Sequence, residues 1–91
     1  MIIDDKIIFD IVKKEVDKDD PCLFLNNGAP NNEYDRESHL IVDAIITRRI
    51  KSPDVLSKYI AKIMSKELGE KRNAGGWDAL SEKIISDIAS L

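Results

Sequence analysis

The sequence predicts an all-α protein, a small four-helix bundle formed by a single domain over residues 1–91. Apolar residues recur at steps of three and four in separate segments, whereas no segment alternates apolar and polar residues as a strand would. Proline, glycine and acidic residues also stand where helices begin and end. We expect helices at about residues 5–18, 36–51, 53–68 and 78–90, with a long ordered loop between the first two.

The first expected helix carries its apolar side chains on one stripe. Asp4 or Asp5 can cap its start, because a carboxylate accepts hydrogen bonds from the free backbone amides there. Asp19, Asp20 and Pro21 end the helix, since proline disfavours a helical backbone at the residue before it. The stripe consists of Ile3, Ile7, Ile8, Ile11, Val12 and Val16.

Residues 20–35, DPCLFLNNGAPNNEYD, interrupt the helical pattern with turn-forming and acidic residues. Long connections in compact domains usually have a function or lack order. The side chains of Leu23, Phe24, Leu25 and Tyr34 are apolar enough to fix this connection to a core. We therefore expect an ordered, exposed loop.

The second and third helices each have a start signal. Asp35 is expected to cap the second helix, and Ser52 followed by Pro53 to begin the third. Gly69 stands where a left-handed residue would close the third helix. The residues expected on their buried faces are Leu40, Ile41, Ala44, Ile45, Ile46, Val55, Leu56, Tyr59, Ile60, Ile63, Met64 and Leu68.

The fourth helix is expected to follow the polar stretch 70–76, with Asp78 as its cap. Trp77 opens its apolar stripe and is either an exposed anchor or a core residue, of which the core is favoured. The other members of the stripe are Leu80, Ile84, Ile85, Ile88 and Leu91.

Groups for catalysis or metal binding are scarce. Cys22 and His39 are single copies, so one chain can form neither a disulfide nor a zinc site from Cys and His. A nucleophile and base made from them would need orienting and oxyanion groups that no motif supplies. Asp17, Asp19 and Asp20 lack the spacing of a calcium loop. We expect no enzyme activity, no cofactor and no metal.

Charge is divided unevenly along the chain. Residues 1–46 carry a formal charge of −6 and residues 47–91 a charge of +3, for a total of −3. An acidic half would steer a basic partner, although two solvated faces would give the same count. The first residues resemble neither a signal peptide nor a membrane segment, so the expected compartment is the cytoplasm, with no membrane partner.

The second half suggests a different class of function. Lys58, Lys62 and Lys66 lie four residues apart on the third helix, and Arg48 and Arg49 precede it. This arrangement is compatible with a DNA-binding helix-turn-helix regulator. The lysines also lie opposite the apolar stripe, where any amphipathic helix places charges, and the chain is acidic. A solvated face is therefore favoured over a nucleic-acid site.

The segment DPCLFLNNGAPNNEYDRESHLIVDAI resembles a pattern of small bacterial helical proteins of uncharacterised function: Asp-Pro-Leu-Gly-Leu, a Gly-Ala-Pro-like turn, then Asp-Glu-Tyr-Asp and a helix. SPDVLSKYIAKIMSKELG is similar to the next segment of that family, so the resemblance covers about residues 10–69. The chain departs from the pattern at Cys22-Leu23, where an apolar residue and Gly are more usual, and at Asn32, where an acid is usual.

Small proteins of this kind are similar to immunity proteins, including those of contact-dependent growth inhibition systems, which bind and neutralise a toxin domain. The resemblance implies a bacterial toxin inhibitor, and an acidic surface would fit a basic target such as a nuclease. The alternatives are the DNA-binding regulator and a structural module that forms a homodimer. Helix capping by Asp35 and core packing of Tyr34 compete with contact roles. The expected partner-binding residues are Asp17, Asp19, Asp20, Glu33, Tyr34, Asp35 and Glu37.

Overall fold

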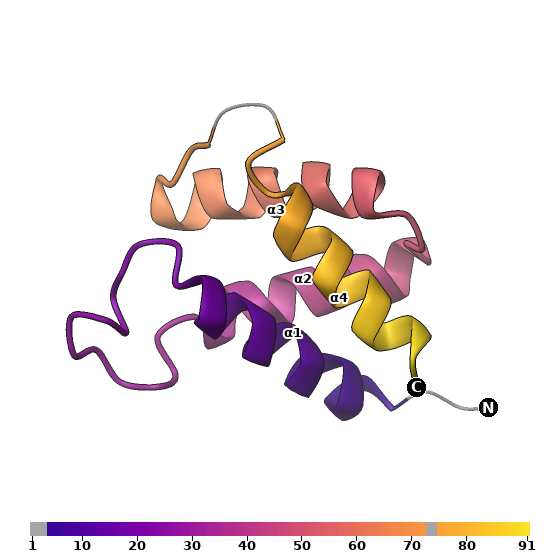
Figure 1. Ribbon diagram of the computed structural model, residues 1–91, viewed down its shortest axis with the longest axis horizontal. Helices are drawn as coiled ribbons and strands as arrows, with labels where there is room; N and C mark the ends of the chain where they lie inside the picture. Colours follow the sequence, from indigo (N-terminus) through magenta and orange to yellow (C-terminus); the bar gives the residue numbers. More distant parts are fainter. Residues whose placement is uncertain (1–3, 73–74) are drawn as a thin grey trace.

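The computed structural model describes residues 4–72 and 75–91, which form four helices and contain no strand (Figure 1). The all-α, four-helix fold is therefore confirmed. Ile3, which we expected on the stripe of the first helix, lies outside the described residues. Within them, no helix is both long and apolar enough to cross a bilayer. The helices are α1 (Asp5–Asp19), α2 (Asp35–Arg48), α3 (Pro53–Leu68) and α4 (Asp78–Ala89).

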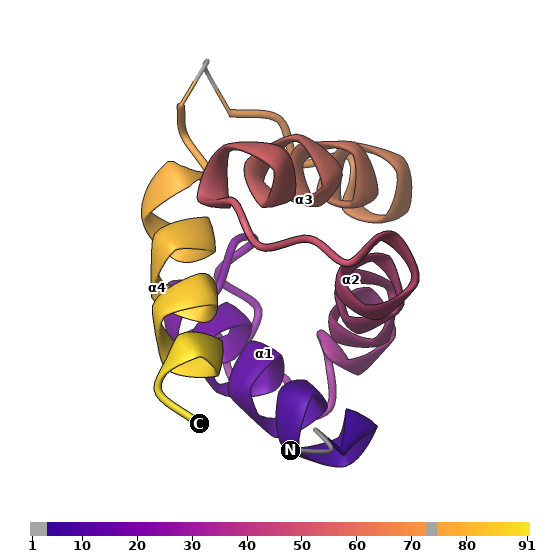
Figure 2. The same cartoon turned by 90° about the vertical axis from the view of Figure 1, so that its right-hand side faces the viewer.

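The helices form a closed ring around one core. α1 packs against α2 and α4, and α3 packs against the same two helices. Figure 2 shows the four elements following one another around this core. The diagonal pairs, α1 with α3 and α2 with α4, do not pack directly within the described ranges. The core consists of Ile8, Val12, Val16, Tyr34, Ile41, Val42, Ile45, Ile50, Leu56, Ile60, Met64, Trp77, Leu80 and Ile84.

The helix ends follow the local signals in part. The Asp4 carboxylate caps α1 by accepting from the Lys6 N–H at 2.9 Å, and Gly69 closes α3 in the left-handed region with φ 66°. α2 ends at Arg48 and not near residue 51, because Arg49 adopts a left-handed backbone with φ 51° and its N–H bonds back to the helix.

The capping roles expected for Asp35 and Asp78 are wrong. Each is the first residue of its helix, and the preceding cap positions hold Tyr34 and Trp77. Both aromatic side chains are buried and form no capping bond. Trp77 is thus a core residue, as favoured from the sequence. Packing, not capping, decides what occupies these two positions.

Some residues expected on buried stripes are exposed, namely Ile7, Ile46, Val55 and Leu91. With 3.6 residues per turn, Ile7 lies about 140° around the helix from the centre of the stripe formed by Ile8, Val12 and Val16. Val55 has the same offset from the buried residues of α3. Ile7 and Val55 therefore lie on the side of the helix away from the core and face solvent, because each helix packs against only two neighbours.

Candidate interaction surface

Cys22 and His39 have separate surroundings. The His39 ring stacks on Phe9, with ring centroids 4.2 Å apart, whereas the Cys22 sulfur lies 3.7 Å from a carboxylate oxygen of Glu70. Burial and the Glu70 charge raise the pKa of the Cys22 thiol, which reduces the thiolate needed for nucleophilic attack. No group of three or more His, Cys, Asp and Glu side chains in the described part of the chain is arranged to hold a metal ion.

Asp20 and Tyr34 hold together the segment that joins α1 to α2. The Tyr34 hydroxyl donates to the Asp20 carboxylate at 2.6 Å, and it accepts from the backbone N–H groups of Cys22 at 3.0 Å and Phe24 at 3.3 Å. Tyr34 is fully buried and Asp20 is 9% exposed. Both side chains thus lie inside the fold and bond to each other, and the contact role expected for them stays a prediction.

The surroundings of this pair fix its protonation. The Asp20 carboxylate also accepts from the N–H groups of Leu25 at 3.1 Å and Asn26 at 2.9 Å. Burial raises the pKa of Asp20, but the hydrogen bonds from Tyr34 and these amides outweigh burial and leave the pKa below its usual value. Burial and the bond to Asp20 raise the pKa of Tyr34 to about 12. At neutral pH the pair is a carboxylate and a phenol.

Lys13 forms ion pairs with two further acids of the expected surface. Its ammonium nitrogen lies 2.9 Å from Asp17 and 2.8 Å from Asp35, and it donates to the backbone carbonyl of Asn31 at 2.6 Å. The hydrogen bond to Asp35 is the main reason that the pKa of Lys13 is raised, and Asp17 adds to it. Both carboxylates remain partly exposed, and because they share one ammonium group, one of their two negative charges is balanced.

Asp19 is paired with a residue far along the sequence. The Arg72 guanidinium donates to both carboxylate oxygens of Asp19, one of them at 3.3 Å, and to the carbonyl of Gly76 at 3.1 Å. The guanidinium carbon also lies 3.8 Å from the centroid of the Trp77 ring. This contact ties the end of α1 to the start of α4, so Asp19 stabilises the ring of helices.

Glu37 and Glu33 have opposite environments. Glu37 is 4% exposed, and one of its carboxylate oxygens is buried without a hydrogen-bond partner among the described residues. Burial and the neighbouring Glu67 raise the pKa of Glu37. The side chain does not reach the surface, and its expected contact role stays a prediction. Glu33 is the single member of the expected set that is classed as exposed and not partly or fully buried.

A different pair of acids lies in a groove between α1 and α2. Along this groove, side chains spaced four residues apart on α1 lie opposite side chains spaced four residues apart on α2. These facing pairs fix the register of the two helices. Lys13 pairs with Asp35 and Phe9 stacks on His39. The next turn brings Asp5 and Asp43 to the same groove. The groove encloses about 340 Å³ and is lined by Asp5, Lys6, Phe9, His39, Val42 and Asp43.

The groove carries unmatched negative charge. Asp5 and Asp43 are exposed, and neither forms an ion pair with another described residue. Lys6, on the groove wall, lies 3.1 Å from Asp10, so its charge is already matched. Sequence reasoning missed this site. The available signal was the four-residue spacing of Asp5 and Phe9 on one helix and of His39 and Asp43 on the next.

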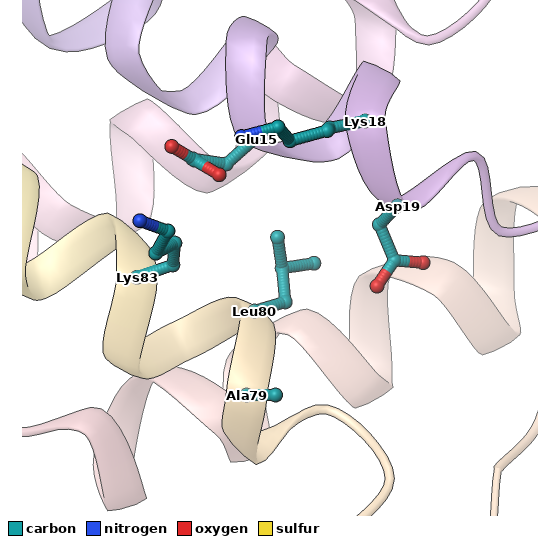
Figure 3. A pocket seen from close by; sticks show the side chains of 6 residues that line it. All are labelled: Glu15, Lys18, Asp19, Ala79, Leu80 and Lys83. Atoms are coloured by element: carbon teal, nitrogen blue, oxygen red, sulfur yellow. The ribbon is translucent and has the colours of Figure 1, made fainter.

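A second pocket lies between α1 and α4 and encloses about 320 Å³ (Figure 3). Leu80 projects between the two helices, while Glu15 and Lys83 line the pocket from α1 and α4. Lys18 and Asp19 complete the charged lining. Two acids and two bases balance each other here, so the pocket lacks the net charge of the α1–α2 groove.

The lysines of α3 form a basic row on the helix diagonal to α1. Lys58, Lys62 and Lys66 are exposed and form no ion pair within the described ranges. The guanidinium of Arg48 lies 5.9 Å from the ring centroid of Tyr59, which borders this row. The protein thus presents acidic and basic surfaces on different helices.

Comparison of this chain with protein-family models, with curated proteins and with solved structures found no match. The candidate surface therefore rests on geometry and charge. Of the surfaces described above, the α1–α2 groove combines concave shape, aromatic side chains and unmatched charge.

Proposed function

We propose that this protein is an immunity protein that neutralises a basic toxin domain, such as a nuclease, by direct binding through the α1–α2 groove. The observation that carries the proposal is the exposed pair Asp5 and Asp43, whose charges have no partner among the described residues. The resemblance of DPCLFLNNGAPNNEYD to a family similar to immunity proteins supports a toxin as the target.

Electrostatics supports inhibition by an acidic surface. A nuclease cleft must attract phosphates and is therefore basic. An acidic protein is steered to the same cleft, and once bound it covers the groups that would contact the nucleic acid. Such an inhibitor needs a complementary surface and no catalytic group of its own.

The internal contacts support the rigidity that tight binding requires. The Asp20–Tyr34 bond fixes the segment between α1 and α2, and Lys13 joins α1 to α2 at one end of the groove. Arg72 ties α1 to the start of α4. A preorganised surface loses less conformational entropy on binding, which favours affinity.

The proposal is tested by calorimetry with the toxin-like domain encoded directly upstream of this gene, at low and high salt. The double variant Asp5→Asn, Asp43→Asn removes the unmatched charges, and we expect it to weaken binding about tenfold or more. Glu82→Gln is the control for removing one acidic charge outside the groove, because Glu82 is exposed on α4 and does not line the groove.

Wild-type binding should also weaken as salt rises, since screening reduces attraction between exposed charges. Absence of binding to the upstream domain removes the proposal. The proposed function is also ruled out if the double variant and Glu82→Gln weaken binding equally, because the groove would then make no specific contribution.

The second candidate function is nucleic-acid binding through α3. The observation that favours it is the exposed row Lys58, Lys62 and Lys66, with α3 following α2 after the short connection 49–52. Its test is fluorescence anisotropy with duplex DNA over a range of salt. Replacing the three lysines by Gln should lower affinity and reduce the slope of log K against log salt by about 0.9 for each phosphate that is no longer neutralised. Salt-independent or undetectable binding removes this candidate.

A further inference from the structure

We infer that the α1–α2 groove binds the guanidinium group of an arginine side chain, stacked on His39 and paired with Asp5 and Asp43. The inference deepens the proposed function and rests on it, because the arginine would come from the basic partner. The chemistry of the groove itself is independent of which protein supplies that side chain.

The aromatic pair supplies a flat platform. The rings of Phe9 and His39 are 4.2 Å apart at 20°, so they stack face to face. Phe9 is the half-buried ring of the stack, and His39 is the exposed ring. Both line the groove, so imidazole surface is open to it. A guanidinium group is planar and weakly hydrated, and it stacks on aromatic faces at small desolvation cost.

The acids supply charge and hydrogen-bond acceptors one helical turn from the platform. Asp5 on α1 and Asp43 on α2 line the groove from its two walls. Guanidinium presents N–H donors in a planar fork, which carboxylates accept in charge-assisted pairs. The ammonium of Lys6 is held by Asp10 at 3.1 Å, so the cation on the groove wall is already paired.

The groove also discriminates between arginine and lysine. Its volume of about 340 Å³ leaves room for a side chain to lie along it, and the buried Val42 gives an apolar wall for the methylene stem. Lysine carries the same charge, but its ammonium is compact, strongly hydrated and unable to stack as a plane. The platform should therefore favour arginine.

The test is an NMR titration of the isotope-labelled protein with N-acetyl-arginine amide and, separately, with N-acetyl-lysine amide. The two probes have equal charge, so a difference between them reports shape and stacking. We expect the arginine probe to shift backbone amides of residues 5–10 and 39–43, and to bind at least about threefold more tightly than the lysine probe.

Three variants separate the contributions of ring and charge. Asp5→Asn with Asp43→Asn should abolish the shifts from both probes, and His39→Leu should remove the preference for arginine. His39→Tyr keeps a flat ring and should retain that preference, while the control Glu82→Gln should change nothing. Circular dichroism confirms that each variant keeps its helices.

Equal binding of the two probes would overturn the inference, as would an arginine preference that survives His39→Leu. Shifts spread evenly over acids outside the groove would also overturn it. Because the titration uses no partner protein, its outcome is separate from that of the upstream-domain experiment. Arginine binding in the groove without binding of that domain would keep the groove as an arginine site but remove the proposed function, and with it the toxin as the source of the arginine.

Discussion

The Tyr34 hydroxyl lies 2.6 Å from the Asp20 carboxylate, so the residue that precedes α2 is bonded directly to the residue that follows α1. The bond closes the connecting segment at its base, while the rest of the segment extends beyond the helix ends (Figure 1). Leu25 and Asn26 are held to the same carboxylate. This buried contact therefore organises the first half of the connection, up to Asn26.

Tyr34→Phe should destabilise the protein by about 2 kcal/mol, because it removes a hydrogen bond to a charged group and the acceptor for two backbone amides. Urea denaturation followed by circular dichroism measures the change in free energy of unfolding. Tyr59→Phe, on the half-buried Tyr59 of α3, is the control and should be nearly neutral. Equal losses of stability in both variants would contradict the role assigned to the Tyr34 hydroxyl.

Stability should decline in acid through Asp20. The folded pKa of Asp20 lies below its ordinary value of 3.8, so its carboxylate stabilises the fold fully above that value. This contribution disappears as the pH falls through the lower folded pKa. In thermal melts from pH 2 to pH 7, the melting temperature of Asp20→Asn should lie below that of wild type at neutral pH. In strong acid the two melting temperatures should be closer. A difference that stays constant with pH would contradict this assignment.

Glu37→Gln should raise the stability at neutral pH, whereas Asp20→Asn lowers it. The folded pKa of Glu37 is raised above 4.5 by burial, so its favourable contribution is complete below pH 4.5 and disappears as the pH rises through the folded pKa. At neutral pH the variant removes a buried charge with an unpartnered oxygen and should stabilise by roughly 1 kcal/mol.

The same pH series of denaturation curves checks this prediction. Wild type and Glu37→Gln should converge as the solution becomes acidic. Glu33→Gln is the control, because Glu33 is exposed just before the start of α2 and the substitution removes a carboxylate at the surface. A destabilised Glu37→Gln protein at neutral pH would indicate that the carboxylate is satisfied.

Arg72→Lys should destabilise by about 1 kcal/mol although it keeps the charge. Lysine cannot reproduce both the two-pronged contact with Asp19 and the planar stack on Trp77. Tryptophan fluorescence reports the second contact, since Trp77 is the one tryptophan of the chain. Lys71→Arg is the control, because Lys71 is exposed. Unchanged fluorescence and stability in Arg72→Lys would show that charge alone suffices.

The helices could be predicted because their signals are local. Pro53 at the first turn of α3, Gly69 at its end and the apolar stripes all act within a few residues. The surroundings of the acids could not be predicted in this way. Asp19 is paired across 53 residues and Asp20 across 14, so their partners depend on how the helices pack.

The groove could not be predicted from local signals either. Asp5 and Asp43 are ordinary exposed residues when α1 and α2 are considered alone. They share a groove only because the helices lie side by side in the register fixed by Lys13 with Asp35 and by Phe9 with His39. Charge counts along the chain favoured the acids near residues 17–37, several of which form ion pairs within the fold.

The packing of α1 against α4 has a consequence for synthesis on the ribosome. α1 leaves the exit tunnel well before α4, which covers its second face, since Val12 and Val16 share a core with Leu80 and Ile84. Joining these two helices closes the longest loop in the ring, so we expect this contact to form late. Until α4 has emerged, an apolar face of α1 stays open to water, and chaperones that bind such faces can protect the nascent chain from aggregation.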